Sequence, residues 1–209
     1  STWPTPPRTY EQPLWDGSAP LTGKTILLYG EQGIGDIIQF IRYAPLIAER
    51  AGRVVVESPA ALERLLATVG GIDQLAAKDA PLPDFDVHAP LLDLPRALGT
   101  TVHTVPAVVP YVAARPDDVA RWRRRIGWRG RLKVGLVWAG RAEHSNDRNR
   151  SIALDRLRPL FDVPKTRFFS LQVGDRAADP SDLGLDRQIE DLSADLTDFA
   201  ETAAALSVL

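Results

Sequence analysis

The chain has 209 residues, of which 44% are hydrophobic, enough to form the core of one large domain or of two small ones. Its 25 lysines and arginines against 27 aspartates and glutamates give a formal net charge of −2. This balance argues against a nucleic-acid-binding surface, which needs a basic excess to neutralise phosphates.

Cysteine is absent, which excludes disulfides, thiolate catalysis and cysteine-bound metals. The three histidines lie at positions 88, 103 and 144, too far apart for a motif of the HExxH type, so we expect neither a metal nor a cofactor. No apolar run reaches the roughly 18–20 residues that span a bilayer, and no basic, apolar leader opens the chain. We therefore expect a cytoplasmic protein without a transmembrane segment.

Residues 1–23 are rich in proline, with Trp3, Tyr10 and Trp15 placed among the prolines. Proline fixes φ and lacks an N–H donor, so the stretch is predicted to be an extended arm. We expect its aromatic side chains to pin the arm to the surface of a domain.

Segments typical of strands and helices alternate over residues 24–114. The apolar run at 25–29 predicts a strand buried on both faces, and a glycine-rich turn at 30–36 leads into a helix with Pro45 as a kink. The same pattern continues with a strand at 53–57, a helix at 59–69, weaker strands at 72–76 and 85–88, and a short helix at 91–98. Such alternation indicates βαβ units and a parallel sheet.

A second round of alternation follows a charged helix, Pro116–Ile126. It consists of a strand at 133–138, a polar loop at 139–150, a helix through Leu154, Leu157 and Phe161, a strand at 167–171 and a helix from Asp198. The sequence therefore predicts an α/β protein with two Rossmann-like domains. The boundaries are an arm at 1–23, a first domain at 24–114, a linker helix at 115–131 and a partial second domain at 132–209.

Two loops follow predicted strands, where ligands bind in open α/β sheets. The first, GEQGIGD at 30–36, has Gly33 and Gly35, which permit close backbone approach, and Asp36 at the start of the helix. The negative charges of Glu31 and Asp36 would repel a phosphate, so we do not expect a nucleotide to bind in this loop. Asp36 has two interpretations: a helix cap, worth about 0.5–2 kcal/mol, or a general base that takes a proton from an acceptor hydroxyl.

The second loop, 140–151, precedes a helix and contains three arginines and one histidine. Guanidinium groups bind phosphate in a bidentate manner, so the loop predicts an anion site, although a solvated polar loop is the simpler alternative. Its candidate ligand-binding residues are Arg141, His144, Arg148, Asn149, Arg150 and Ser151. His88 follows a strand, and we interpret it as structural.

Five segments in register resemble the family 9 glycosyltransferase domains of bacteria. They are KTILLYGEQGIGDIIQFIRYAPLIAER, FDVHAPLLDLPRALGTT, KVGLVWAGRAEHSNDRNRSIAL, RFFSLQVG and DLSADLTDFAETAAALSVL, which span nearly the whole chain from about residue 12. The family includes heptosyltransferases that use ADP-heptose and lipopolysaccharide, and it is often preceded by tetratricopeptide repeats.

This resemblance implies a GT-B fold, in which two Rossmann-like domains face each other, with the acceptor bound by the first and the nucleotide-sugar by the second. It implies that Asp36 is the catalytic base, that DRNRSI (147–152) is the phosphate-binding loop, and that Gln172 in SLQVG (170–174) lines the nucleotide pocket. The family's Asp-Thr-x-x-x-His donor segment does not occur before Leu209. We therefore expect this stretch alone to be inactive.

Three hypotheses remain at this point. The first is a metal-independent, inverting glycosyltransferase that moves a sugar from a nucleotide-diphosphate sugar to a glycan or protein hydroxyl. The second is a non-catalytic carbohydrate-binding or scaffold module that keeps only the fold. The third, a dinucleotide-dependent enzyme, is the weakest because the first loop reads GxxGxG rather than GxGxxG.

Overall fold

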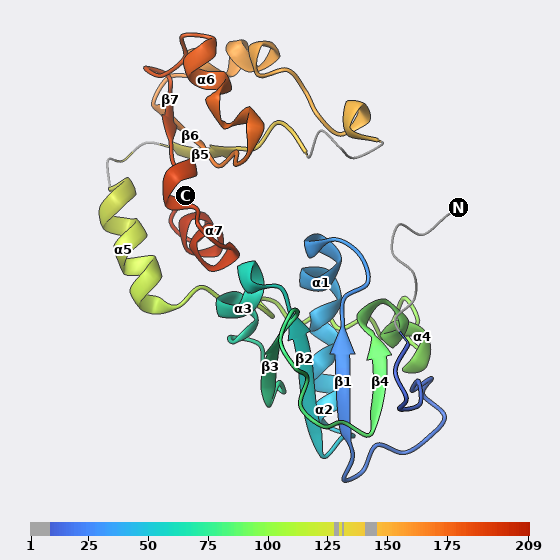
Figure 1. The fold of residues 1–209 in the computed structure, drawn as a ribbon. Helices are drawn as coiled ribbons and strands as arrows, with labels where there is room; N and C mark the ends of the chain where they lie inside the picture. Colours follow the sequence, from blue (N-terminus) through green and yellow to red (C-terminus); the bar gives the residue numbers. More distant parts are fainter. Residues whose placement is uncertain (1–8, 128–129, 131, 141–145) are drawn as a thin grey trace. The chain divides into compact units, whose positions relative to one another are not determined.

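The computed structural model describes residues 9–127, 130, 132–140 and 146–209. The chain divides into two compact units, Ser1–Ala113 and Ala114–Leu209 (Figure 1). Each unit is built around a parallel sheet. The chain therefore has the α/β class that the alternating pattern predicts.

The first unit contains a four-stranded sheet in the order β3-β2-β1-β4. Its strands are β1 (Thr25–Tyr29), β2 (Arg53–Ser58), β3 (Gln74–Ala77) and β4 (Val87–Pro90). The centres of β1 and β2 are fully buried, as expected for continuous apolar runs covered on both faces. The chain moves from β1 to one side of the sheet and then returns to β4 on the other side, so β1 and β4 flank the topological switch point.

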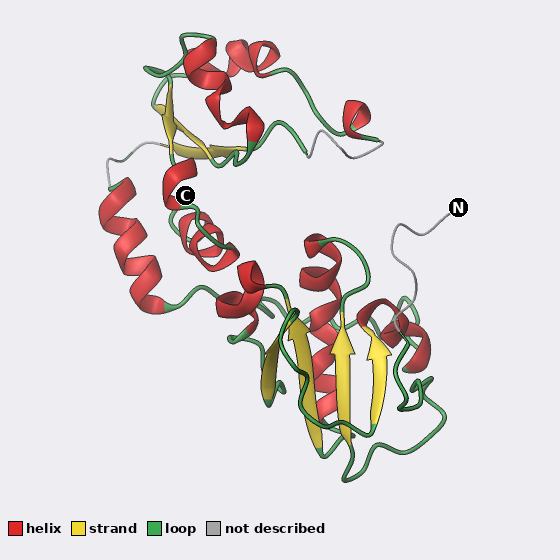
Figure 2. Cartoon of the chain, viewed as in Figure 1, coloured by secondary structure: helices red, strands yellow, loops and turns green. Residues whose placement is uncertain are grey.

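Helical segments connect β1 to β2 and β2 to β3, and others follow β4 (Figure 2). After β1 the chain forms α1 (Ile34–Phe40), a 3₁₀ turn η1 (Ile41–Tyr43) and α2 (Ala44–Ala48). Pro45 lies in the first turn of α2, which confirms the predicted interruption of the helix. The remaining helices are α3 (Ala60–Leu66), η2 (Leu91–Asp93) and α4 (Leu94–Ala97).

The face of the sheet that carries the side chains of Leu27 and Tyr29 is covered by coil rather than by a helix. Leu27 and Tyr29 of β1 pack there with Val55 and Ala76, against the partly buried side chains of Tyr10, Leu82 and Phe85. Leu82 and Phe85 lie in the connection between β3 and β4, at the position where a doubly wound sheet usually carries a crossover helix.

The arm joins the sheet at its β4 edge. The His88 N–H donates to the Pro13 carbonyl at 3.2 Å and the Trp15 N–H donates to the His88 carbonyl at 2.8 Å, which gives a short parallel bridge. The Tyr10 ring lies 4.7 Å from the His88 ring, and Trp15 is 4% exposed. The expectation that aromatic side chains pin the arm is therefore confirmed for Tyr10 and Trp15, whereas Trp3 lies outside the described residues.

The second unit contains a three-stranded sheet in the order β5-β6-β7. Its strands are β5 (Leu132–Leu136), β6 (Thr166–Ser170) and β7 (Ile189–Asp191), and the last of these was not predicted from the sequence. Three further turns of 3₁₀ helix are η3 (Asp147–Asn149), η5 (Asp175–Ala178) and η6 (Ser193–Asp195).

Helical segments cover both faces of this sheet. On one face, α5 (Pro116–Ile126) and α7 (Phe199–Leu206) pack over Phe169 and Leu192. On the other face, the 3₁₀ segment η4 (Leu154–Asp162) packs over Phe168 and Ile189, and the short α6 (Asp179–Asp182) precedes β7. The predicted helix through Leu154 is thus a 3₁₀ segment, with Pro159 inside it.

Helix α5 is an integral part of the second unit rather than a linker between two domains. Its Trp122 Nε1 donates to Glu201 Oε2 of α7 at 2.7 Å, and Arg121 Nη2 donates to Glu201 Oε1 at 2.6 Å. Trp122 and Ile126 are each 2% exposed in the core of this unit. The charged sequence of α5 suggested a linker because its apolar face carries few residues.

Within the described ranges, we find no helix with the length and apolar character needed to cross a bilayer.

Candidate functional site

A cavity of about 380 Å³ opens beyond the carboxyl ends of β5 and β6. Ligands of open α/β sheets bind at this edge, so the position alone makes it the leading candidate in the second unit. The described residues that line it are Val137, Ala139, Gly140, Asp147, Leu171, Gln172, Val173, Gly174, Asp175 and Arg176.

Gln172 holds the turn that follows β5. Its Oε1 accepts hydrogen bonds from the backbone N–H groups of Trp138 at 3.1 Å and Ala139 at 2.9 Å, and its Nε2 donates to the Val173 carbonyl at 3.1 Å. The side chain is buried, so these bonds satisfy groups that would otherwise be costly to leave unpaired. Gln172 therefore lines the cavity and shapes its wall, and its contact with a nucleotide stays a prediction.

Ser151 and Asp147 hold the next residue of the same turn. Ser151 Oγ accepts from the Gly140 N–H at 2.9 Å and donates to Asp147 Oδ1 at 2.6 Å. A Cβ on Gly140 would lie 2.8 Å from Asp147 Oδ1, so a larger residue at position 140 would make the Asp147 side chain shift. Ser151, predicted as a phosphate ligand, thus has a structural contact within the loop.

The predicted cationic residues of this loop differ in their surroundings. Arg148 and Arg150 are exposed, and neither guanidinium group makes a hydrogen bond or ion pair within the described part of the chain. Asn149 Nδ2 donates to Asn146 Oδ1 at 2.6 Å, which turns its side chain back onto the loop. Arg141 and His144 lie outside the described residues.

Sequence patterns missed Asp175 and Arg176, which line this cavity, and their neighbour Asp179. Arg176 and Asp175 follow Gly174, which has φ +79, a value that glycine adopts readily. Arg176 forms an ion pair with Asp179 at 2.6 Å, and Asp179 Oδ2 also accepts from Trp138 Nε1 at 2.9 Å. The signal that could have found them is Gly174 shortly after a predicted strand, followed directly by the charged residues Asp175 and Arg176.

In the first unit, Asp36 lies in the first turn of α1, which follows β1 at the topological switch point of the sheet. Helix α1 begins at Ile34, with Gly33 as its N-cap, so Asp36 occupies the third helical position rather than the cap itself. Its Oδ2 accepts from the Gly33 N–H at 3.0 Å, which is the reach-back half of a capping box. The capping contact is therefore present, although at a different position from the one expected.

The glycines around Asp36 are not required by backbone strain. Gly33 has φ −71, and Gly35 is not among the glycines with positive φ. A Cβ on Gly35 would meet nothing within 4 Å. The fold of this unit therefore leaves open space at Gly35, at the edge of the sheet where ligands bind.

His88 is a buried residue of the sheet, 5% exposed. Its Nδ1 hydrogen bonds with the Tyr29 hydroxyl at 3.2 Å. Burial lowers the pKa of His88 because it disfavours the charged imidazolium, and a hydrogen bond to the Gln12 carbonyl partly opposes this effect. These contacts agree with the structural interpretation of His88.

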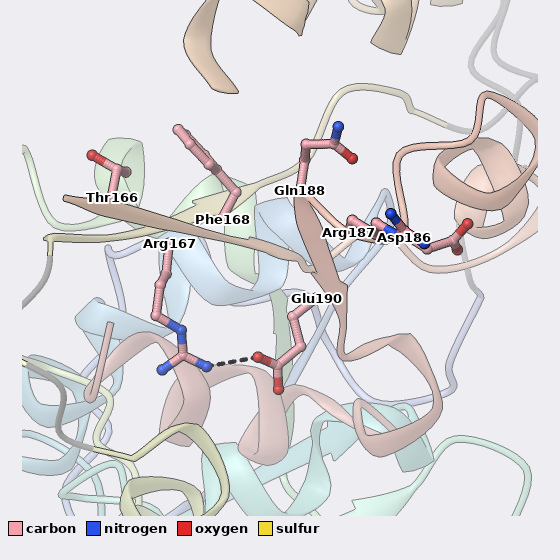
Figure 3. A pocket seen from close by; sticks show the side chains of 7 residues that line it. All are labelled: Thr166, Arg167, Phe168, Asp186, Arg187, Gln188 and Glu190. Atoms are coloured by element: carbon pink, nitrogen blue, oxygen red, sulfur yellow. Dashed lines mark hydrogen bonds and ion pairs between the residues drawn. The ribbon is translucent and has the colours of Figure 1, made fainter. Parts of the chain in front are cut away.

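A larger cavity of about 590 Å³ lies at the opposite edge of the second sheet (Figure 3). Figure 3 shows Phe168 and Gln188 on one face of the sheet, and Arg167 and Glu190 on the other, joined by an ion pair of 2.7 Å. This larger cavity adjoins the amino ends of β6 and β7, whereas ligands of open parallel sheets bind beyond the carboxyl ends of the strands. We therefore place the candidate site at the smaller cavity.

Comparison with known proteins identifies the fold. A glycosyltransferase of family 9 from Veillonella parvula matches 88% of the chain and 74% of its own length, with a TM-score of 0.59 and 12% identity. The ADP-heptose lipopolysaccharide heptosyltransferase II of E. coli matches 88% of the chain and 76% of its own, with a TM-score of 0.59 and 10% identity. The chain thus shares the fold of these two glycosyltransferases, as the sequence resemblance implied.

Sequence comparison adds one curated relative. Protein FlbA of Caulobacter vibrioides is 26% identical over an alignment 221 positions long, which covers 93% of the chain and 37% of FlbA. The chain therefore spans little more than a third of this relative. No protein-family model matches the chain. The tetratricopeptide context stays a prediction.

Proposed function

We propose that the protein is a glycosyltransferase that moves a sugar from a nucleotide-diphosphate sugar to a hydroxyl of a glycan or protein acceptor. The second unit binds the nucleotide-sugar and the first unit binds the acceptor. The observation that carries this proposal is the cavity beyond β5 and β6, beside a loop in which the guanidinium groups of Arg148 and Arg150 have no partner within the described part of the chain.

The cavity suits the nucleoside part of the donor. Its volume of about 380 Å³ falls within the range of small-molecule sites. Val137, Leu171 and Val173 supply apolar wall for a base, whereas the carboxylate of Asp175 is an acceptor suited to ribose hydroxyls. The apolar wall and this carboxylate therefore fit the base and the ribose of a nucleoside.

The loop beside the cavity suits the diphosphate. Arg148 and Arg150 have guanidinium groups free of described partners, and Arg141, His144 and Asn149 belong to the same loop in the sequence. Guanidinium groups bind phosphate oxygens through paired hydrogen bonds and neutralise the charge that develops on a leaving diphosphate. We therefore assign charge neutralisation to arginine and propose a metal-independent reaction.

Asp36 is the proposed base. The acceptor hydroxyl gives its proton to the Asp36 carboxylate, and its oxygen attacks the anomeric carbon on the face opposite the diphosphate. The bond from that carbon to the diphosphate oxygen breaks, so the configuration inverts and the nucleoside diphosphate leaves with the electron pair. The open space at Gly35 supports this role, because it leaves room for an acceptor beside Asp36.

Nucleotide binding and hydrogen exchange test the donor site. Nucleoside diphosphates should bind to the whole gene product and should slow exchange across residues 139–151. The exchange of β1 and β2 in the first unit serves as the internal control. Binding without any protection of residues 139–151 would contradict the assignment of the diphosphate to this loop.

A second candidate is a non-catalytic carbohydrate-binding module. The observation in its favour is the Asp36 carboxylate, which already serves as a capping group for α1. A panel of nucleotide-sugars with sugar acceptors separates the two. Sugar binding without release of nucleoside diphosphate from any donor supports the binding module, and turnover that Asp36→Asn abolishes supports the transferase.

A further inference from the structure

A network of Trp138, Asp179 and Arg176 adjoins the cavity. The Trp138 indole donates from Nε1 to Asp179 Oδ2 at 2.9 Å. The Arg176 guanidinium donates from Nε to Oδ1 and Oδ2 of the same carboxylate, at 3.0 and 2.8 Å, and its Nη2 lies 2.6 Å from Oδ2. One carboxylate thus joins the turn after β5 to the segment after β6.

Burial decreases from one end of this network to the other. Trp138 is 2% exposed, whereas the side chains of Asp179 and Arg176 are 17% and 42% exposed. The buried indole and the carboxylate therefore hold one side of a guanidinium whose other side is open. Its Nη1 makes no hydrogen bond within the described part of the chain, so it is available to a ligand.

Charge makes Arg176 distinctive among the residues that line the cavity. It is the one lysine or arginine among the described lining residues, whose other charged members are Asp147 and Asp175. Its hydrogen bond to Asp179 raises the pKa of Arg176 and lowers the pKa of Asp179. Both partners therefore remain ionised at neutral pH, and the cation stays in place.

We propose that Arg176 binds a phosphate group of the nucleoside diphosphate in this cavity and that Asp179 is the positioning residue that aims its guanidinium. The inference rests on the proposed function. A long side chain that is already held in one rotamer loses less conformational entropy when a ligand binds it. Asp179 thus promotes phosphate binding although its own charge is negative.

A double-mutant cycle measured by calorimetry tests both roles, with UDP and ADP compared with uridine and adenosine. Arg176→Ala should lower the affinity for the diphosphate that binds by roughly tenfold or more, the scale of a charged hydrogen bond, and leave the nucleoside affinity unchanged. The diphosphate affinity of Arg176→Lys should lie between those of the unmodified protein and Arg176→Ala, because lysine keeps the charge but not the planar guanidinium group. Asp179→Ala should weaken diphosphate binding by roughly threefold or more, but should have no further effect beside Arg176→Ala.

Asp155→Ala is the matched control. Arg158 and Asp155 also form an i,i+3 ion pair in this unit, on the segment η4 and not among the residues that line the cavity. Removal of this ion pair should leave the affinities for diphosphates and nucleosides unchanged. The thermal midpoint should fall with Asp179→Ala in both backgrounds, because Trp138 loses its partner in each.

The outcomes separate this inference from the proposed function. If the unmodified protein binds no nucleoside diphosphate, both are overturned. If Arg150→Ala weakens binding and Arg176→Ala does not, only the role of Arg176 is overturned. Equal weakening of diphosphate and nucleoside by Arg176→Ala, or loss of affinity with Asp179→Ala whether or not Arg176 is present, would assign the network a purely structural role.

Discussion

Gly17 of the arm packs directly against the carbonyl group of Ala97 at the end of α4. A Cβ added to Gly17 would lie 2.0 Å from the Ala97 oxygen, and the residue has φ +98. No larger side chain fits this contact without movement of the backbone. The arm is thus tied to the first unit by a steric fit as well as by its hydrogen bonds to β4.

Gly17→Ala should therefore destabilise the first unit by at least about 2 kcal/mol, because it adds a steric clash to the strain of a positive φ. Gly23→Ala is the matched control: Gly23 has φ +74, but a Cβ there meets nothing within 4 Å. That variant should lose only about 1 kcal/mol. Denaturant-dependent hydrogen exchange in β4 measures both losses, and equal losses would show that the contact with Ala97 is unimportant.

Asp36→Asn separates the capping role from the catalytic role. The asparagine Oδ1 still accepts from the Gly33 N–H, so the thermal midpoint should change little. If Asp36 is the base, the single-turnover rate of the whole gene product should fall by ~10²–10⁴, the usual scale for loss of a general base. Nucleotide affinity should remain unchanged, because we assign the donor to the second unit.

The rate and the thermal midpoint must be measured on the same preparation of the variant. A normal rate together with a normal midpoint would return Asp36 to its capping role. The first unit would then have no catalytic group assigned to it.

Arg150→Ala should weaken the binding of a nucleoside diphosphate by roughly 1.5–3 kcal/mol, because we propose a direct, charged contact. The effect should shrink at high salt, since exposed charges are screened. Arg187→Ala removes another exposed arginine of the same unit, beside the cavity at the opposite edge of the sheet, and serves as the control. Calorimetry that finds equal effects for the two variants would contradict the site.

Stability of the first unit should depend on pH through His88. Burial lowers the pKa of His88 in the folded protein below the ordinary value of 6.5. As pH falls through 6.5 the unfolded chain takes up a proton that the folded unit resists, so stability decreases until the folded pKa is reached. His88→Gln should flatten this part of the pH profile, and His103→Gln, which removes an exposed imidazole, is the control.

Thermal midpoints between pH 5 and pH 8 measure the effect. A slope that is the same with and without His88 would show that another group produces it.

The secondary structure that depends on local chemistry was largely predictable. The apolar runs gave β1, β2, β5 and β6, and the proline followed by aspartates at 116–118 gave the start of α5. The strand β7 was missed because Ile189–Asp191 has only one apolar residue and so shows no alternation of apolar and polar side chains. Its strand conformation comes from pairing with β6, which local sequence does not encode.

The sequence by itself determined the class of fold, the glycine-rich and arginine-rich loops, and the position of Gln172 after a strand, because strand and loop chemistry repeats along the chain. Only the tertiary structure showed that Gln172 binds the backbone of the turn after β5, that Ser151 binds Gly140 and Asp147, and that Asp179 joins Trp138 to Arg176. The hydrogen bonds from Gly140 to Ser151, from Ala139 to Gln172 and from Trp138 to Asp179 join residues 11 to 41 positions apart. Parallel pairing brings the carboxyl ends of β5 and β6 to one edge of the sheet, and that pairing decides which of the loop side chains meet.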